Sequence, residues 1–187
     1  MEVITVDRNG EKKVSIESYE CGERRVIRLT GGINSEMIDK IISKVEYLDS
    51  ISNDDIYIYI NSPGGVVTDG FALIDVVNRL ESNVIYVAQG QAASMAAFIL
   101  ASGKKGNRKA TPNTEIMLHQ VLGGTSGQAS DIELAAKQIK KTKNKINSLL
   151  SEWTGKDFET IEKDTDRDYF MSAEEALAYG IIDEIIT

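Results

Sequence analysis

Residues 56–100 decide the fold that this sequence predicts: IYIYINSPGGVVTDGFALIDVVNRLESNVIYVAQGQAASMAAFIL. Isoleucine and tyrosine alternate over residues 56–60, and this period of two predicts a strand with its isoleucines on one face and its tyrosines on the other. The turn-forming residues NSPGG at 61–65 end that strand. Apolar residues then recur at helical spacing over 68–80. A strand that turns directly into a helix is typical of a parallel α/β unit.

Further strands and helices are predicted on both sides of this unit. Alternating or continuous short apolar runs predict strands at 25–29, 83–88, 115–118 and 181–186. Helical spacing of apolar residues predicts helices at 34–48, 90–100, 130–153 and 172–178. Ser172 and Glu175 have the spacing of a capping box at the start of the last helix. Because strands and helices alternate along the chain, we expect an α/β fold with right-handed crossovers.

The long helix at 130–153 departs from this alternation. It follows a glycine-rich stretch, and Gly155 ends it. The helix carries more apolar side chains than a solvated helix needs, and these are Ile132, Leu134, Ile139, Ile146, Leu149 and Leu150. We therefore expect an arm that projects from the body and packs against another subunit.

Length and composition predict one globular domain over residues 1–187, because no linker-like stretch divides the chain. The formal net charge of −8 argues against a nucleic-acid partner, and the lysines at 137–145 are interpreted as a solvated helix face. The charged first twenty residues and the lack of a long apolar run argue against a signal peptide or a membrane span. A single cysteine, Cys21, suits a reducing compartment. The expected location is therefore cytoplasmic.

Ser94 is the first candidate catalytic residue. It lies within GQAASMAA, where a strand turns into a helix that begins at or just after the serine. A hydroxyl at such a corner is accessible, and the first free N–H groups of the helix can bind a developing oxyanion. The competing interpretation is a plain helix cap, which is the commoner role of a serine at this position.

His119, the only histidine in the chain, follows the strand predicted at 115–118. An imidazole is the usual base that activates a serine, so His119 is the candidate general base, with a lone surface histidine as the alternative. One histidine and one cysteine cannot form a usual zinc site, so no metal is expected. Asp164, Asp166 and Asp168 alternate nearby without the spacing of a calcium loop, and one of them can orient the histidine.

The glycines at 64 and 65 follow a strand and leave room for a peptide backbone. Their N–H groups, together with that of Met95, are candidate oxyanion donors, and a simple turn is the alternative. No glycine-rich stretch matches a phosphate loop or a dinucleotide fingerprint, so no organic cofactor is expected.

Five motifs together resemble the ClpP family, the proteolytic subunits of the ATP-dependent Clp proteases. They are YINSPGG (59–65), GQAASMAAFILASG (90–103), MLHQ (117–120), GGTSGQASDIE (123–133) and DTDRDYFMSAEEALAYGIID (164–183). The resemblance covers about residues 25–183 and keeps the order of the motifs. It implies the ClpP/crotonase-like spiral of ββα units, with residues 123–155 as a projecting helical handle and residues 1–20 as an N-terminal axial segment.

The same resemblance implies a serine endopeptidase. Its catalytic triad would be Ser94, His119 and Asp168, and its oxyanion hole would use the N–H groups of Gly65 and Met95. Substrate would bind as an added β-strand along Gly64, Val66, Val67 and Leu122. No metal or organic cofactor would be required.

The resemblance also implies an assembly and a partner. Two stacked heptameric rings would enclose a chamber, with subunit contacts at Gln128, Asp131, Asp166 and Arg167. A Clp-family AAA+ ATPase would feed unfolded polypeptides into that chamber. The chain departs from the family pattern at Val121, where proline is usual, and at Arg79 and Gln89, where apolar side chains are usual.

Three other functions remain open at this point. A crotonase-fold acyl-CoA enzyme would share the spiral and a glycine oxyanion hole without needing a serine–histidine pair. A Ser–Lys hydrolase would use Lys104 or Lys105 as its base. A non-catalytic ring subunit would assemble with an active paralogue.

Overall fold

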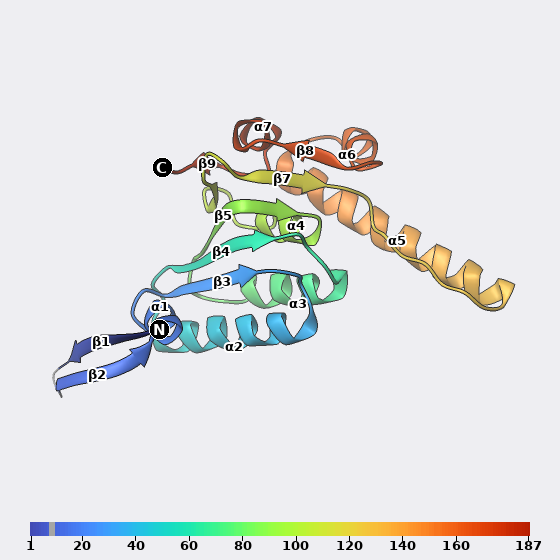
Figure 1. Cartoon of the computed structure of the whole chain (residues 1–187). Helices are drawn as coiled ribbons and strands as arrows, with labels where there is room; N and C mark the ends of the chain where they lie inside the picture. The colour runs from blue at the N-terminus through green and yellow to red at the C-terminus, as the bar shows by residue number, and fades with distance from the viewer. Residues whose placement is uncertain (8–9) are drawn as a thin grey trace.

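The computed structural model describes residues 1–7 and 10–187, and its body is an α/β sheet structure (Figure 1). The main sheet has the strand order β3-β4-β5-β6-β9, with β7 beside β5 and β8 beside β7. Every pairing in this sheet is parallel except that of β7 with β8. The predicted α/β fold is confirmed.

The strands are β1 (Glu2–Asp7), β2 (Gly10–Ser15), β3 (Val26–Thr30), β4 (Ile56–Ser62), β5 (Val84–Ala93), β6 (Arg108–Ala110), β7 (Glu115–Leu118), β8 (Tyr169–Met171) and β9 (Glu184–Ile185). The helices are α1 (Ile16–Gly22), α2 (Ser35–Ile51), α3 (Val67–Val77), α4 (Met95–Ala101), α5 (Ala129–Thr154), α6 (Phe158–Asp164) and α7 (Ala173–Tyr179). Among the described residues, no helix combines the length and apolar character needed to cross a bilayer.

The hydrophobic core lies between the sheet and the helices α2, α3 and α4 (Figure 1). The alternation in β4 works as predicted, because Ile56, Ile58 and Ile60 are fully buried while Tyr57 and Tyr59 are half-buried. The isoleucines face the helices, and burial of apolar surface on this scale is the main force that stabilises such a layer.

The predicted helix at 90–100 is wrong over its first residues. Strand β5 continues to Ala93, and α4 begins only at Met95. The reason is a change of partner along β5: residues 86–88 pair with β6, whereas residues 91–93 pair with β7. The small apolar residues of this stretch suit either conformation, and the ladder to β7 decides between them.

The helix α5 projects from the body as a long arm (Figure 1). Its inner end is anchored by the buried side chains of Ile146 and Leu150, while Ile132 and Leu134 near its outer end are exposed. Gly155 ends the helix in the left-handed conformation, with φ of +76°.

The N-terminal segment forms a β1–β2 hairpin followed by α1, none of which was predicted. Residues 8 and 9 of the expected axial segment lie outside the described residues. The short elements β6, α6 and β8 were also not predicted, and β9 is shorter than the expected strand at 181–186.

Candidate active site

Ser94 occupies a strained corner between β5 and α4. Its φ of +55° and ψ of −125° lie in a region that costs free energy for any residue with a Cβ. The surrounding backbone holds this conformation, because the Ser94 N–H donates to the Met117 carbonyl at 2.8 Å. In this backbone conformation the Ser94 hydroxyl points away from the end of β5 and toward His119, which follows β7.

His119 contacts Ser94 directly. The distance between Ser94 Oγ and His119 Nε2 is 2.7 Å, a hydrogen bond of good length. The sheet explains this contact: β5 and β7 are parallel, and Ala93 pairs with Met117. The residues that follow the two strands therefore meet at the same edge. The His119 side chain is mostly buried, with 15% of it exposed.

Asp168 lies on the other side of His119, at 3.9 Å from its Oδ1 to His119 Nδ1. The antiparallel register of β8 on β7 pairs Leu118 with Tyr169, so the residue before Tyr169 falls beside the residue after Leu118. At this distance the two side chains are electrostatic neighbours, and the separation is too long for a hydrogen bond. The Asp168 side chain is 62% exposed.

The two neighbouring aspartates have other partners. Asp164 accepts a hydrogen bond from the Tyr179 hydroxyl at 2.9 Å. The backbone carbonyl of Asp166 accepts from the Gln120 amide at 2.8 Å. Asp168 is therefore the aspartate of the three whose carboxylate approaches the histidine.

The candidate oxyanion donors lie beside Ser94. Met95 is the first residue of α4, so its N–H has no intrahelical acceptor. Gly65 has φ of +155°, and a Cβ there would lie 2.2 Å from the Ile33 carbonyl oxygen, so only glycine fits. Gly64 has φ of +91° and is buried against the Ala93–Met95 backbone, where a Cβ would lie 2.7 Å from that of Ser94.

A cleft of about 460 Å³ opens beside the Ser94–His119 pair. Its wall includes Gly65, Val67, Leu122 and Asp168. The apolar part of the wall is formed by Phe98, Met117, Leu118, Ile146 and Leu150. Of the predicted substrate-binding residues, Gly64 and Val66 do not line this cleft. Sequence analysis missed Phe98, Ile146 and Leu150 as site residues, since they come from α4 and α5 and share no motif.

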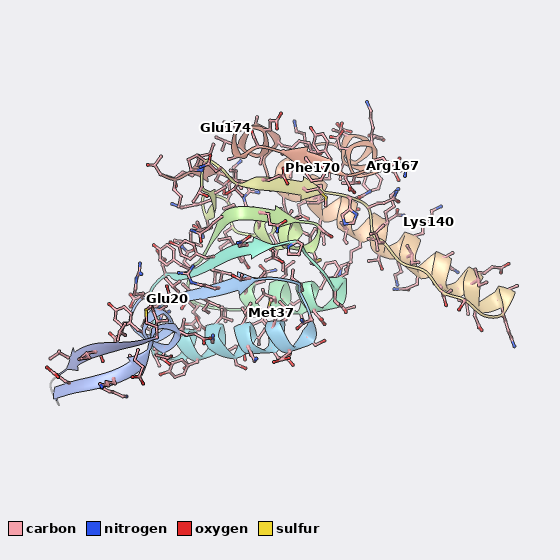
Figure 2. The ribbon with its side chains drawn as sticks, in the orientation of Figure 1. Glu20, Met37, Lys140, Arg167, Phe170 and Glu174 are labelled. Atoms are coloured by element: carbon pink, nitrogen blue, oxygen red, sulfur yellow. The ribbon has the colours of Figure 1, made fainter. Side chains whose placement is uncertain are left out.

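The predicted subunit-contact residues lie at two exposed places. Gln128 and Asp131 are at the outer end of α5, where Gln128 is the N-cap residue. Asp166 and Arg167 lie beside the body and form a loose ion pair at 3.8 Å. Figure 2 labels Arg167, in the segment between α6 and β8, and Lys140, on the projecting helix α5.

A second cavity, of about 770 Å³, lies away from this site. It is lined by Lys104, Lys105 and Arg108, and Ser94 is not part of its wall. This geometry disfavours a Ser–Lys pair made from Lys104 or Lys105. Within residues 1–7 and 10–187, no group of three or more His, Cys, Asp or Glu side chains is placed to hold a metal ion.

A comparison with protein-family models assigns the class of the protein. The family described as Clp protease matches residues 9–187, which is nearly the whole chain. The fold and the match together define a serine-peptidase family of the α/β class. The chain belongs to the Clp protease family and is a ClpP-type peptidase.

Proposed function

We propose that this chain is a serine endopeptidase in which Ser94 is the nucleophile, His119 the general base and Asp168 the residue that orients His119. The observation that carries the proposal is the 2.7 Å contact between Ser94 Oγ and His119 Nε2 at a strained strand end. A plain helix cap does not explain that contact, because the Ser94 side chain makes no capping hydrogen bond. The proposal extends the family assignment to particular residues.

The chemistry is acyl transfer. His119 Nε2 takes the hydroxyl proton while Ser94 Oγ bonds to the carbonyl carbon of the scissile peptide. The N–H groups of Gly65 and Met95 stabilise the oxyanion of the tetrahedral intermediate. His119 then gives its proton to the departing amine, and a water molecule, activated by the same imidazole, hydrolyses the acyl-enzyme.

Asp168 orients the imidazole during these steps. Its carboxylate lies 3.9 Å from His119 Nδ1, so a shift of about 1 Å brings it to the length of a charge-assisted hydrogen bond. Contacts of this kind often tighten only when substrate is bound. The exposed position of Asp168, outside the regular part of β8, allows such a shift.

Extended substrate fits the site as an added strand. Val66 and Leu122 are exposed on the two sides of the site, at 47% and 77%, and Val67 lines the cleft. A strand between these segments is recognised mainly through its backbone, which suits unfolded polypeptides of varied sequence.

The cleft predicts which side chain precedes the cleaved bond. Phe98, Ile146 and Leu150 make much of its wall apolar, so a leucine or phenylalanine is accommodated, while a glutamate would be buried in the same cleft as the Asp168 carboxylate. We expect kcat/KM for peptides with leucine or phenylalanine at this position to exceed that for peptides with glutamate by about 100-fold or more. Fluorogenic peptides that differ only at that residue measure the ratio, and equal rates for leucine and glutamate would contradict the assignment of the cleft.

The assembly and partner are further parts of the proposal. Ile132 and Leu134 on the arm are exposed at 45% and 66%, and a second copy of the chain would cover such apolar side chains. We propose stacked heptameric rings whose contacts include Gln128, Asp131, Asp166 and Arg167, fed by a Clp-family AAA+ ATPase in the cytoplasm. The family assignment supports rings and an ATPase partner in general.

A labelling experiment tests the function directly. A fluorophosphonate probe is expected to modify Ser94 in the wild-type protein and to leave a Ser94→Ala variant unlabelled, while light scattering reports the size of each in solution. Labelling of the assembled wild-type protein supports the peptidase. Absence of labelling together with binding of coenzyme A would favour the acyl-CoA enzyme, and an unlabelled, inactive ring would indicate the non-catalytic subunit.

A further inference from the structure

Ser62, at the end of β4, has a fully buried hydroxyl next to the candidate oxyanion loop. Its Oγ donates to the Gly31 carbonyl at 2.6 Å and accepts from the Gly64 N–H at 3.0 Å. A hydroxyl has one proton to donate, and this one is used for Gly31. The side chain therefore connects the end of β3 to the loop that carries Gly65.

Backbone hydrogen bonds fasten the same two segments on both sides of Ser62. The Gly31 N–H donates to the Asn61 carbonyl at 3.0 Å, and the Ile33 N–H donates to the Gly64 carbonyl at 2.8 Å. The Val66 N–H donates to the Ile33 carbonyl at 3.0 Å. The loop after β4 is thus held against the segment after β3 as well as by the contact between Ser62 and Gly64 within its own turn.

These contacts account for the N–H groups of the loop one by one. The Gly64 N–H is taken by Ser62 and that of Val66 by Ile33, whereas the Gly65 N–H has no acceptor within residues 1–7 and 10–187. Gly65 is exposed at the cleft, so its unpaired N–H is open to a ligand, whereas the N–H groups of Gly64 and Val66 are already used. Gly65 lines the cleft next to Ser94, which makes its N–H the free donor of this loop.

We propose that Ser62 is a positioning residue that fixes the oxyanion hole by holding the Gly64 N–H and thereby setting the direction of the Gly65 N–H. This inference rests on the proposed peptidase function. It goes beyond that function because Ser62 is shut off from the cleft and does not contact substrate. The hydroxyl acts only through the backbone of Gly64 and Gly65.

The reason that a side chain is needed here is the glycine pair itself. Gly64 and Gly65 have φ of +91° and +155°, and neither has a Cβ that restricts rotation of the peptide between them. Oxyanion donors must lie within about 2.7–3.1 Å of the developing charge, so a small rotation of this peptide removes most of the stabilisation. The Ile33 N–H holds this peptide through the Gly64 carbonyl, and the Ser62 hydroxyl adds a restraint on the peptide before it through the Gly64 N–H, so that both ends of Gly64 are fixed.

The test compares Ser62→Ala with a matched control, Ser82→Ala. Ser82 is also buried, and its hydroxyl also donates to a backbone carbonyl, that of Ser52 at 3.1 Å, but it lies before β5 at the opposite end of the sheet. We expect Ser62→Ala to lower kcat for a fluorogenic peptide by about tenfold or more, with KM within about twofold. Ser82→Ala is expected to keep the kcat of the wild-type protein.

A second measurement separates positioning from a general loss of structure. A peptide boronate forms a tetrahedral adduct with the nucleophilic serine, so its affinity is expected to fall by the same factor as kcat in Ser62→Ala. Ser62→Cys replaces the hydroxyl with a larger and weaker hydrogen-bonding group, and it gives a smaller loss in the same direction if the alanine variant does not assemble.

The outcomes are distinct. If wild-type Ser94 is labelled by a fluorophosphonate and the folded Ser62 variants keep the wild-type kcat and boronate affinity, the positioning role is wrong while the peptidase stands. A loss seen equally in Ser82→Ala, or only in KM, also overturns it. If wild-type Ser94 is not labelled, the proposed function itself fails.

Discussion

Replacing Ser94 with alanine is expected to lower kcat for small fluorogenic peptides by at least about 10⁴-fold, while the chain still folds and assembles. The variant removes the atom that forms the acyl-enzyme. It removes little else, because the hydroxyl makes its one side-chain hydrogen bond in the described part of the chain to His119. Alanine meets the same backbone strain at φ of +55° as serine does, so the free energy of unfolding should barely change.

The contact between Ser94 and His119 leads to a second expectation, for the His119→Ala variant. Since the two side chains act as one unit, His119→Ala alone should cost about as much as the double variant with Ser94→Ala. Ser102→Ala is the matched control, because its hydroxyl donates to the Ile99 carbonyl at the far end of α4 and takes no part in the chemistry. Initial rates and sizes in solution are measured for these four variants and the wild type. An assembled Ser94→Ala variant with more than a few per cent of wild-type activity would rule Ser94 out as the nucleophile.

The part of the site that sequence could predict is the pair Ser94 and His119. Each follows an apolar run that is recognisable from local spacing, and each has a side chain suited to nucleophilic catalysis. The carboxyl ends of parallel strands meet at one edge of a sheet, so two such residues are natural neighbours once an α/β fold is inferred. For this pair, the local sequence pattern and the strand order of the sheet both lead to the same prediction.

The choice of Asp168 over Asp164 could not be made from the residues alone. It depends on the antiparallel register between β7 and β8, and β8 has only three residues, with no periodic pattern of its own. The resemblance to the ClpP family supplied that assignment instead. The apolar cleft could not be predicted from the sequence either. Phe98 and Ile146 line it together only because α4 packs against α5, which is also a long-range contact.

The boundary between β5 and α4 could not be predicted from the local sequence. Apart from Gln91, residues 90–93 are small, and their composition suits a tightly packed helix as well as a strand. Pairing of Gln91–Ala93 with β7 decides for the strand, and β7 lies more than twenty residues further along the chain. Only the long-range ladder defines where α4 begins, and with it the corner at Ser94.

Arg108, on β6, is a buried charged side chain whose loss should cost several kcal/mol of stability. Its guanidinium is 4% exposed and forms a bidentate ion pair with Asp183, in which Nε donates to the carboxylate at 2.8 Å. The same group donates to the Trp153 carbonyl at 3.0 Å, near the end of α5. One buried cation thus joins β6, the base of the arm and the segment before β9.

Arg108→Ala is expected to lower the free energy of unfolding by about 3–5 kcal/mol, because it leaves Asp183 as a largely buried charge without its partner. Lys40→Ala is the control at the surface. Lys40 forms an ion pair with Glu36 in which the two side chains are 67% and 80% exposed, so its loss should cost only a small fraction of what the loss of Arg108 costs. Denaturant unfolding at one fixed protein concentration measures both, and equal costs would contradict the role assigned to burial.

The pH dependence of the unfolding free energy of Arg108→Ala tests whether the unpaired Asp183 carboxylate causes the loss of stability. Burial alone would raise the pKa of the Asp183 carboxyl, but the Arg108 guanidinium and the Gly106 N–H hold that pKa below its ordinary value of 3.8. A carboxyl whose pKa is lowered on folding stabilises the protein above its ordinary pKa, and this contribution is lost as the pH falls through the folded value. Without the guanidinium, the pKa of Asp183 in the folded variant is higher than in the folded wild type. The difference in unfolding free energy between wild type and Arg108→Ala should therefore be full at pH 7, begin to shrink as the pH falls through the pKa of the folded variant, and be lost below that of the folded wild type. Other carboxyls with lowered pKa values, such as those of Glu20 and Asp49, are common to both proteins and cancel in the comparison. A difference that stays constant into acid would mean that Arg108 stabilises the fold through its carbonyl contacts rather than through Asp183.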